Sequence, residues 1–284
     1  MLRSFGATAI LVAIGLCGGA PGNAQTAKPK WGLDGTGAFC TLSRTIEDAP
    51  ASATHTTLLV RAYPGTGVSA FMVIRGTAPV TGHPTPDMTI GFDSSGASYA
   101  KPVSIIALGE VGKAITVDYL PPSFLDEFAE ASVVNVTVGK TVIGSYAIPG
   151  AAKAVAAFRE CETAKLTEWG ADPAEFEPGG RRPMPEGESQ KWIGFADLRL
   201  PRNVAGTFAA FAIARLTIGT DGHVEACAVI DSNQNTNLNS VACKLLTDRA
   251  RYQPARDKDG KPLRSVALYR AQWSVENTIT WEKF

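Results

Sequence analysis

A stretch of 20 residues divides this chain and limits how it can fold. Residues 171–190, ADPAEFEPGGRRPMPEGESQ, contain four prolines and three glycines but few large apolar side chains. Proline cannot donate the backbone hydrogen bond that regular elements need, and glycine loses much entropy when it is ordered. Such a composition is typical of a linker. We therefore expect two domains, residues 30–170 and residues 191–284, joined by the linker 171–190.

The first 24 residues have the layout of a secretory signal. One positive charge, Arg3, precedes an apolar run over residues 7–16, and small residues follow up to Ala24. The run is shorter than the roughly 20 residues that span a bilayer. We expect cleavage near Ala24 and an exported, periplasmic mature chain. The alternatives are an uncleaved signal that remains as a membrane anchor, or a lipid anchor at Cys17.

The charge balance argues against one class of partner. The chain has 27 basic and 27 acidic residues, and loss of Arg3 with the signal leaves the mature chain close to neutral. Nucleic acids and anionic membranes attract surfaces with a basic excess. Neither is therefore expected as a partner.

The first predicted domain reads mainly as strands. Short apolar or β-branched runs are separated by Gly, Pro, Asp and Ser, which is typical of a β-sandwich-like sheet. These runs cover residues 55–63, 69–76, 88–92, 103–108, 114–120, 132–138 and 141–148. The last two are predicted to form a hairpin that turns at Gly139 and Lys140. Capping and composition also predict a short helix over residues 122–132 and a longer, Ala-rich helix over residues 149–170.

The second predicted domain has the order strand, strand, helix, strand. Asp221 and Gly222 provide the turn of a hairpin. Apolar side chains at Leu238, Val241, Ala242, Leu245 and Leu246 then form one helical stripe. Pro254 cannot continue this helix and restricts Gln253 to extended geometry. After a turn at Asp259 and Gly260, residues 262–275 are predicted to run as one strand. The chain is therefore α+β, with one helix on an antiparallel sheet at the C-terminal end.

The four cysteines that follow the signal are Cys40, Cys161, Cys227 and Cys243. An even number in an oxidising compartment indicates two disulfides, for which three pairings exist. The simplest is Cys40–Cys161 and Cys227–Cys243, because each predicted domain then keeps its own bond. In the chain-entropy model the first, closing about 120 residues, contributes roughly 4–5 kcal/mol, and the second roughly 3 kcal/mol. Cys243 projects about 120° from the centre of the apolar stripe, so the second bond requires Cys227 to lie on that side.

The second predicted domain resembles the TonB C-terminal domain family over about residues 191–276. The most specific matches are the D-G-x-V hairpin at residues 221–224 and the Arg-aromatic-x-Pro run at residues 251–254. The resemblance implies a ββαβ domain whose last strand accepts a partner's extended segment as an added strand. Energy transducers of that family also carry a membrane helix and a long spacer, where this chain has a signal and the short linker.

The resemblance implies a partner-binding surface on the last strand. The candidate residues are Leu263, Arg264, Val266, Leu268, Arg270 and Gln272. The implied partner is an envelope protein, such as a segment of an outer-membrane receptor, or a second copy of the chain. The alternative is a structural strand whose edge is covered by a neighbour or by residues 276–284.

No residue pattern predicts catalysis, a metal or a cofactor. His55, His83 and His223 are isolated in the sequence, without the spacing of metal ligands. The cysteines form no C-x-x-C pair, and the serine-containing segment 92–98 is interpreted as a turn, not as a nucleophile elbow. We interpret the five tryptophans as caps on small cores, with an exposed sugar- or peptide-binding set as the alternative.

Three functions follow as hypotheses. The first is a periplasmic, non-enzymatic adaptor that binds an envelope protein by strand addition. The second is an envelope enzyme whose site lies in the first domain, for which a convergent pocket with acidic or histidine side chains is the sign. The third is a structural dimer formed by pairing of the last strands.

Overall fold

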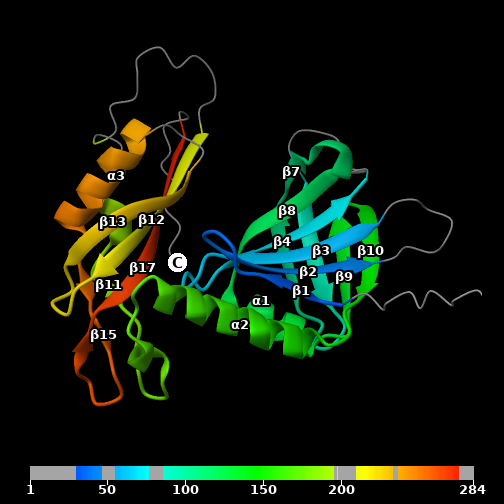
Figure 1. Ribbon diagram of the computed structural model, residues 1–284. Helices are drawn as coiled ribbons and strands as arrows, with labels where there is room; N and C mark the ends of the chain where they lie inside the picture. Colours follow the sequence, from blue (N-terminus) through cyan, green and yellow to red (C-terminus); the bar gives the residue numbers. More distant parts are fainter. Residues whose placement is uncertain are drawn as a thin grey trace, which may run out of the picture.

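The computed structural model describes residues 30–46, 55–76, 86–194, 197, 209–232 and 236–274. The predicted signal peptide, His83 and the tail from residue 275 lie outside these residues. The chain is α+β and mainly strands, with three α-helices in the part that is described. Figure 1 shows two lobes, which we call the N-terminal unit (described residues 30–168) and the C-terminal unit (described residues 171–274).

Two antiparallel sheets form the N-terminal unit. The larger consists, in spatial order, of β1 (Gly32–Asp34), β2 (Cys40–Ile46), β3 (Thr56–Ala62), β4 (Ser69–Arg75), β8 (Lys113–Leu120) and β7 (Ser104–Ala107). The smaller consists of β10 (Thr141–Ala147), β9 (Val133–Val138), β5 (Asp87–Phe92) and β6 (Ser98–Pro102). The 3-10 turn η1 (Gly109–Val111) joins β7 to β8. Burial alternates along β3, because successive side chains of a strand point to opposite faces. The predicted hairpin at Gly139 is the β9–β10 turn.

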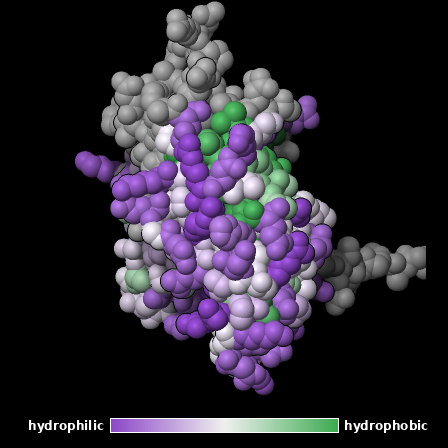
Figure 2. Space-filling model, turned by 90° about the vertical axis from the view of Figure 1, so that its left-hand side faces the viewer, coloured by the Kyte–Doolittle hydropathy of each residue, from purple (hydrophilic) through white to green (hydrophobic). Residues whose placement is uncertain are grey.

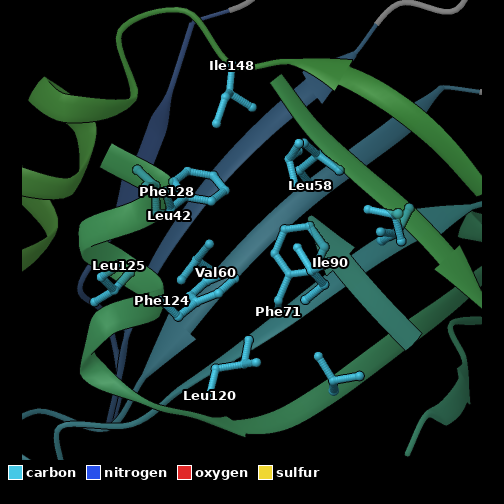
Figure 3. Close-up of a cluster of buried hydrophobic side chains, with 14 of the residues drawn as sticks. Leu42, Leu58, Val60, Phe71, Ile90, Leu120, Phe124, Leu125, Phe128 and Ile148 are labelled. Carbon is cyan, nitrogen blue, oxygen red and sulfur yellow. The ribbon is translucent and has the colours of Figure 1, made fainter. Parts of the chain in front are cut away.

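The core of the N-terminal unit lies between these sheets and is closed by α1 (Pro122–Glu130). Figure 3 shows Phe124 and Phe128 of α1 reaching the side chains of Phe71 and Ile90 on the sheets. The ring centroids of Phe71 and Phe124 are 5.9 Å apart in an edge-to-face arrangement, which aromatic rings prefer. Pro122 occupies the first turn of α1, where a missing amide hydrogen costs nothing.

The long helix α2 (Ala151–Glu168) completes the N-terminal unit. Val155 and Phe158 are fully buried against the sheets. A disulfide between Cys40 and Cys161 ties β2 to the helix. The first disulfide pairing is thus as predicted. It fixes α2 covalently to the larger sheet.

The C-terminal unit is a three-stranded antiparallel sheet with one helix. The strands, in spatial order, are β13 (Val224–Ser232), β12 (Ala209–Ile218) and β17 (Ser265–Ser274). The helix α3 (Thr236–Arg249) packs on one face through the buried side chains of Ala242 and Leu246. The predicted Cys227–Cys243 disulfide is present and joins β13 to α3. Along the chain the order is β12, β13, α3 and, after three short strands, β17.

Glycine is required at the hairpin between β12 and β13. Gly222 has a φ of +82°, and a Cβ there would lie 1.9 Å from the carbonyl oxygen of Tyr252. The Tyr252 amide donates to the Gly222 carbonyl at 2.9 Å. The extended segment after α3 is therefore fixed to the hairpin turn, which gives a structural reason for the helix to stop before Pro254.

The strand predicted over residues 262–275 is divided. The short strands after α3 are β14 (Tyr252–Gln253), β15 (Ala255–Arg256) and β16 (Pro262–Leu263). β16 pairs with β15 around the turn at Gly260, and the chain leaves that pairing at Arg264 before β17 begins. Leu263 consequently lies in β16 and Arg264 between the two strands, whereas the other four candidate binding residues lie in β17.

Residues 171–190 are more structured than a linker. They contain the 3-10 turn η2 (Pro173–Phe176) and the strand β11 (Met184–Pro185), and the 3-10 turn η3 (Ser189–Lys191) overlaps their end. β11 pairs with β14. The expectation of a segment without elements is corrected here: Pro173, Pro178 and Pro185 lie in η2, in the turn that follows it and in β11, where few amide donors are needed.

Candidate functional site

The candidate site is the outer edge of β17. This strand pairs with β12 over its whole length, from Ser265 opposite Ile218 to Ser274 opposite Ala209. Among the described strands, β17 has no second neighbour in the sheet. An edge strand leaves backbone amide and carbonyl groups without ladder partners, so another chain can pair with them.

The beginning of this edge is already occupied. The Arg264 carbonyl accepts a hydrogen bond from the Asp172 amide at 3.2 Å, and the Val266 carbonyl accepts one from Arg182 Nη2 at 2.9 Å. Arg182 Nε in turn lies 3.2 Å from Oε1 of Glu175. The segment 172–182 therefore caps the first two outward carbonyls.

The edge opens beyond Val266. In an antiparallel pair the amide and carbonyl of one residue point to the same side. Because the Val266 carbonyl points away from β12, the backbone groups of Leu268 and Arg270 also point outward by alternation. Within the described part of the chain, no hydrogen bond from another segment reaches the outward groups of these two residues.

A cavity of about 280 Å³ lies against this open edge. Its lining includes Leu268 and Arg270 of β17 together with Arg182, Pro183 and Pro185. Gly65, in the β3–β4 turn of the N-terminal unit, also borders it. The cavity is thus built by three parts of the chain that are distant in sequence. Two of the residues that line it are arginines, Arg182 and Arg270.

A contact network explains why the β3–β4 turn approaches here. Gly65 has a φ of +76°, and a Cβ at this position would lie 1.9 Å from Arg182 Nη1. The Gly65 amide also lies near the carboxylate of Glu162 on α2. Burial raises the pKa of Glu162 to about 7, although the Gly65 amide and the nearby Arg182 oppose this shift. Glycine therefore serves both the turn and the close approach of Arg182.

The structure distributes the six predicted binding residues over different environments. Leu263 is buried in β16. Arg264 forms an ion pair with Glu225 at 2.7 Å, and Val266 is fully buried beside Leu166. The side chains of Leu263 and Val266 are therefore closed to a partner, whereas that of Arg264 is 60% exposed although it is paired. Leu268 and Arg270 border the cavity, and Gln272 lies opposite Phe211 in the β12–β17 ladder.

Sequence reasoning missed the contacts that join the two units. The Arg270 guanidinium lies 4.5 Å from the centroid of the Tyr119 ring, and the Tyr63 hydroxyl donates to Oδ2 of Asp231. Burial, followed by this hydrogen bond to Asp231, raises the pKa of Tyr63. In the sequence these residues are polar members of alternating strands, and such a pattern gives no signal of a contact over 168 positions.

The other side of the C-terminal unit has a different character. Figure 2, which views the molecule from the α3 side, shows mostly hydrophilic side chains with a smaller hydrophobic area. The exposed side chains Lys244 and Asp248 of α3 form an ion pair there at 2.7 Å. This face is solvated, in contrast to the apolar inner face of the helix.

The tryptophans inside the described ranges act in packing. Trp31 packs edge-on against Phe128, and Trp192 lies close to the rings of Tyr252 and Tyr269. The side chain of Trp273 and all of Trp281 fall outside the description.

No group of histidine, cysteine and carboxylate side chains suited to a metal ion occurs among the described residues. In the same residues, no helix has the length and apolar character needed to cross a membrane. Comparison of the chain with protein-family models, with curated proteins and with solved structures returned no match.

Proposed function

We propose that the protein is a non-enzymatic adaptor of the cell envelope that binds an extended segment of another envelope protein. The segment would add to the outer edge of β17 and extend the sheet β13-β12-β17. The observation that carries this proposal is the one-sided pairing of β17, with the outward backbone groups of Leu268 and Arg270 facing a cavity. Strand addition needs only such free backbone groups for affinity. The resemblance to the TonB C-terminal domain family supports the same surface.

The capped start of the edge defines where pairing begins. Asp172 and Arg182 already bind the carbonyls of Arg264 and Val266, so the partner's first hydrogen bonds would be made at Leu268. Arg182 and Arg270 border the cavity, and a partner segment with an acidic side chain at this point would gain a charge-assisted contact. The proposed partner is therefore a short, extended segment with an acidic residue, not a long hydrophobic strand.

Site-specific photo-crosslinking in cells tests this proposal. A photoreactive amino acid is placed at Leu268, and, as a matched control, at Lys244 on the solvated face of α3. Products are identified by mass spectrometry. We expect crosslinks from Leu268 to a periplasmic segment of a second envelope protein, and none to that protein from Lys244.

Two results would contradict the adaptor proposal. Crosslinks from Leu268 only to a second copy of the chain would indicate a dimer formed by paired β17 strands. Absence of any product that distinguishes Leu268 from Lys244 would show that the edge recruits no protein in the cell.

A further inference from the structure

A second cavity, of about 290 Å³, lies where the two units meet. The N-terminal unit contributes the outer face of its larger sheet, through β3, β4, β7 and β8. The C-terminal unit contributes Phe211 of β12, Asp231 of β13 and Arg270 of β17. Ligand sites are often found at such junctions. This volume is just below the usual range for ligand pockets, which indicates a small ligand.

Two buried hydroxyl groups in this cavity lack partners. Ser69 and Thr116 are 4% and 3% exposed, and both border the cavity. Their hydroxyl oxygens have no hydrogen-bond partner among the described residues. Buried polar groups are nearly always satisfied in folded proteins. Both oxygens are closed off from solvent in the ligand-free chain, so a molecule that enters the cavity would complete them after a small shift of these side chains.

Two guanidinium groups on the cavity are held in place by aromatic rings. Arg61 lies 4.1 Å from the centroid of the Phe39 ring, and Arg270 lies 4.5 Å from that of Tyr119. The Nε atoms of both arginines are buried and have no partner in the described part of the chain. A stacked guanidinium keeps its in-plane N–H groups available for a carboxylate.

A carboxylate faces the same space without a direct ion pair. Asp118 borders the cavity, and within the described ranges no lysine or arginine nitrogen lies within 4.0 Å of its oxygens. Burial raises the pKa of this group, and the more distant charges of Arg270 and Arg61 only partly oppose that effect. A ligand that carries both a positive and a negative group would therefore find a partner for each of them here.

The backbone at the cavity is strained. Tyr119 has a φ of +61° and is the one residue other than glycine with a positive φ among the described residues. Bulky residues rarely adopt this conformation, and such strain is concentrated at ligand sites and other functional positions. At this position it sets the ring of Tyr119 below the guanidinium of Arg270.

We propose that this cavity binds one free α-amino acid in its zwitterionic form. Its carboxylate would be held by the guanidinium groups of Arg61 and Arg270, and its ammonium group by Asp118. The hydroxyls of Thr116 and Ser69 complete the polar contacts, while Met72, Ile106 and Phe211 offer an apolar surface to the side chain. The wall carries two basic and two acidic residues, which matches a ligand with separated charges and no net charge.

The site goes beyond the proposed adaptor function, since strand addition at β17 requires no small molecule. It nevertheless shares Arg270 with the cavity at the edge, and this residue lies between the two. The variants that test the amino-acid site are therefore chosen in the N-terminal unit, away from the edge.

Calorimetric titration of the mature protein with each of the 20 common L-amino acids, after dialysis, tests this proposal. We expect at least one to bind with a dissociation constant in the micromolar to low millimolar range. Asp118→Asn should then weaken binding at least about tenfold, because a hydrogen bond between charged groups is lost. Asp126→Asn serves as the control, since this exposed carboxylate pairs with Arg159 far from the cavity wall, and it should leave binding unchanged.

Thr116→Val separates a ligand contact from a packing role. Removal of an unsatisfied buried hydroxyl should leave the ligand-free protein equally stable or more stable, while it weakens amino-acid binding several-fold. Absence of binding by all 20 amino acids up to 10 mM (roughly the weakest affinity such a small ligand would need) would overturn the proposal. So would binding that neither Asp118→Asn nor Thr116→Val weakens.

Discussion

The two units of this molecule differ in how their sheets are covered. In the N-terminal unit the inner faces of two sheets cover each other, and a cluster of aromatic rings with fully buried Phe71, Phe124 and Phe128 fills the space between them. In the C-terminal unit one face of a single sheet is covered by α3, through small side chains such as Ala212 and Ala242. The opposite face of this sheet is covered in part by residues from outside the unit.

That dependence is visible in three contacts. Val266 packs with Leu166 and Ala171 at the end of α2. Arg215 lies 5.6 Å from the ring centroid of Trp169, and the Tyr63 hydroxyl donates to Asp231. A small core with a second face that needs cover is marginal on its own, so we expect this unit to be unstable when separated. The C-terminal unit therefore relies on residues outside it to cover part of its sheet.

The largest effect is expected from cutting the chain between the units. Residues 30–170 keep the aromatic core and the Cys40–Cys161 bond, so this fragment should fold. Residues 191–284 lose β11 and the cover of Val266, and should show little cooperative unfolding. Circular dichroism during heating of both fragments checks this; a cooperative transition of fragment 191–284 equal to that of the whole chain would refute the dependence.

Removal of the disulfides should affect the two units unequally. The pair Cys40→Ala and Cys161→Ala opens a loop of 121 positions and should cost about 4–5 kcal/mol of unfolding free energy. The pair Cys227→Ala and Cys243→Ala opens a loop of 16 and should cost about 3 kcal/mol. Guanidinium denaturation measures both, and a larger loss for the shorter loop would contradict the entropic explanation.

Arg182→Met should lower the stability of the junction between the two units. Glu175 is 3% exposed, and its burial raises the pKa of this carboxyl, while Ser265 and Arg182 oppose the shift. Loss of the arginine leaves a buried charge unpaired, so we expect a cost of up to about 3 kcal/mol near neutral pH. A carboxyl whose pKa is raised on folding destabilises more as the pH rises, so the cost should be smaller at pH 5 than at pH 8.

A second substitution identifies the cause. Glu175→Gln in the Arg182→Met background should recover part of the lost stability, because no charge remains to be buried. Arg159→Met, which breaks the exposed pair with Asp126, is the control and should cost less than about 1 kcal/mol. Equal losses from Arg182→Met and Arg159→Met would show that the Glu175 pair does not stabilise the junction.

Glu162→Gln should change the pH dependence of stability more than its level. Burial raises the pKa of Glu162 from 4.5 to about 7. The contribution of this protonated group is complete below about pH 4.5 and decreases as the pH rises toward 7. The variant should therefore match the wild type at pH 4.5 and become relatively more stable up to pH 7. Urea midpoints of both proteins at several pH values test this, and a constant difference would contradict it.

Local sequence patterns were sufficient to predict most helices and strands, but not which other segments pack against them. The hairpin at Gly222, the helix stripe through Leu246 and both disulfide pairings were predicted, because each depends on nearby residues or on a count. The division at Arg264 was not, since nothing in a run of alternating side chains shows that another segment will bind the carbonyls of Arg264 and Val266. The elements inside residues 171–190 were missed because prolines at turns and at a two-residue strand have the same composition as a linker.

The candidate site was likewise predictable only in part: its strand was, but the other segments that line it were not. The resemblance directed attention to the last strand, and Leu268 and Arg270 do border a cavity there. The part of its lining at Arg182 and Gly65 comes from other parts of the chain and had no sequence signal. The contacts around Asp118 and Asp231 depend on how the two units meet, which no local pattern encodes.

Amide hydrogen exchange along β17, measured by NMR on the mature protein, tests the open edge most directly. The amides of Ala267 and Tyr269 point toward β12, and those of Leu268 and Arg270 point outward, by the alternation of an antiparallel ladder. We predict slow exchange for Ala267 and Tyr269 and exchange at least about a hundredfold faster for Leu268 and Arg270, since an amide without a partner opens at almost no cost. Equal protection of all four amides would show that the edge is already covered, and would contradict strand addition at β17.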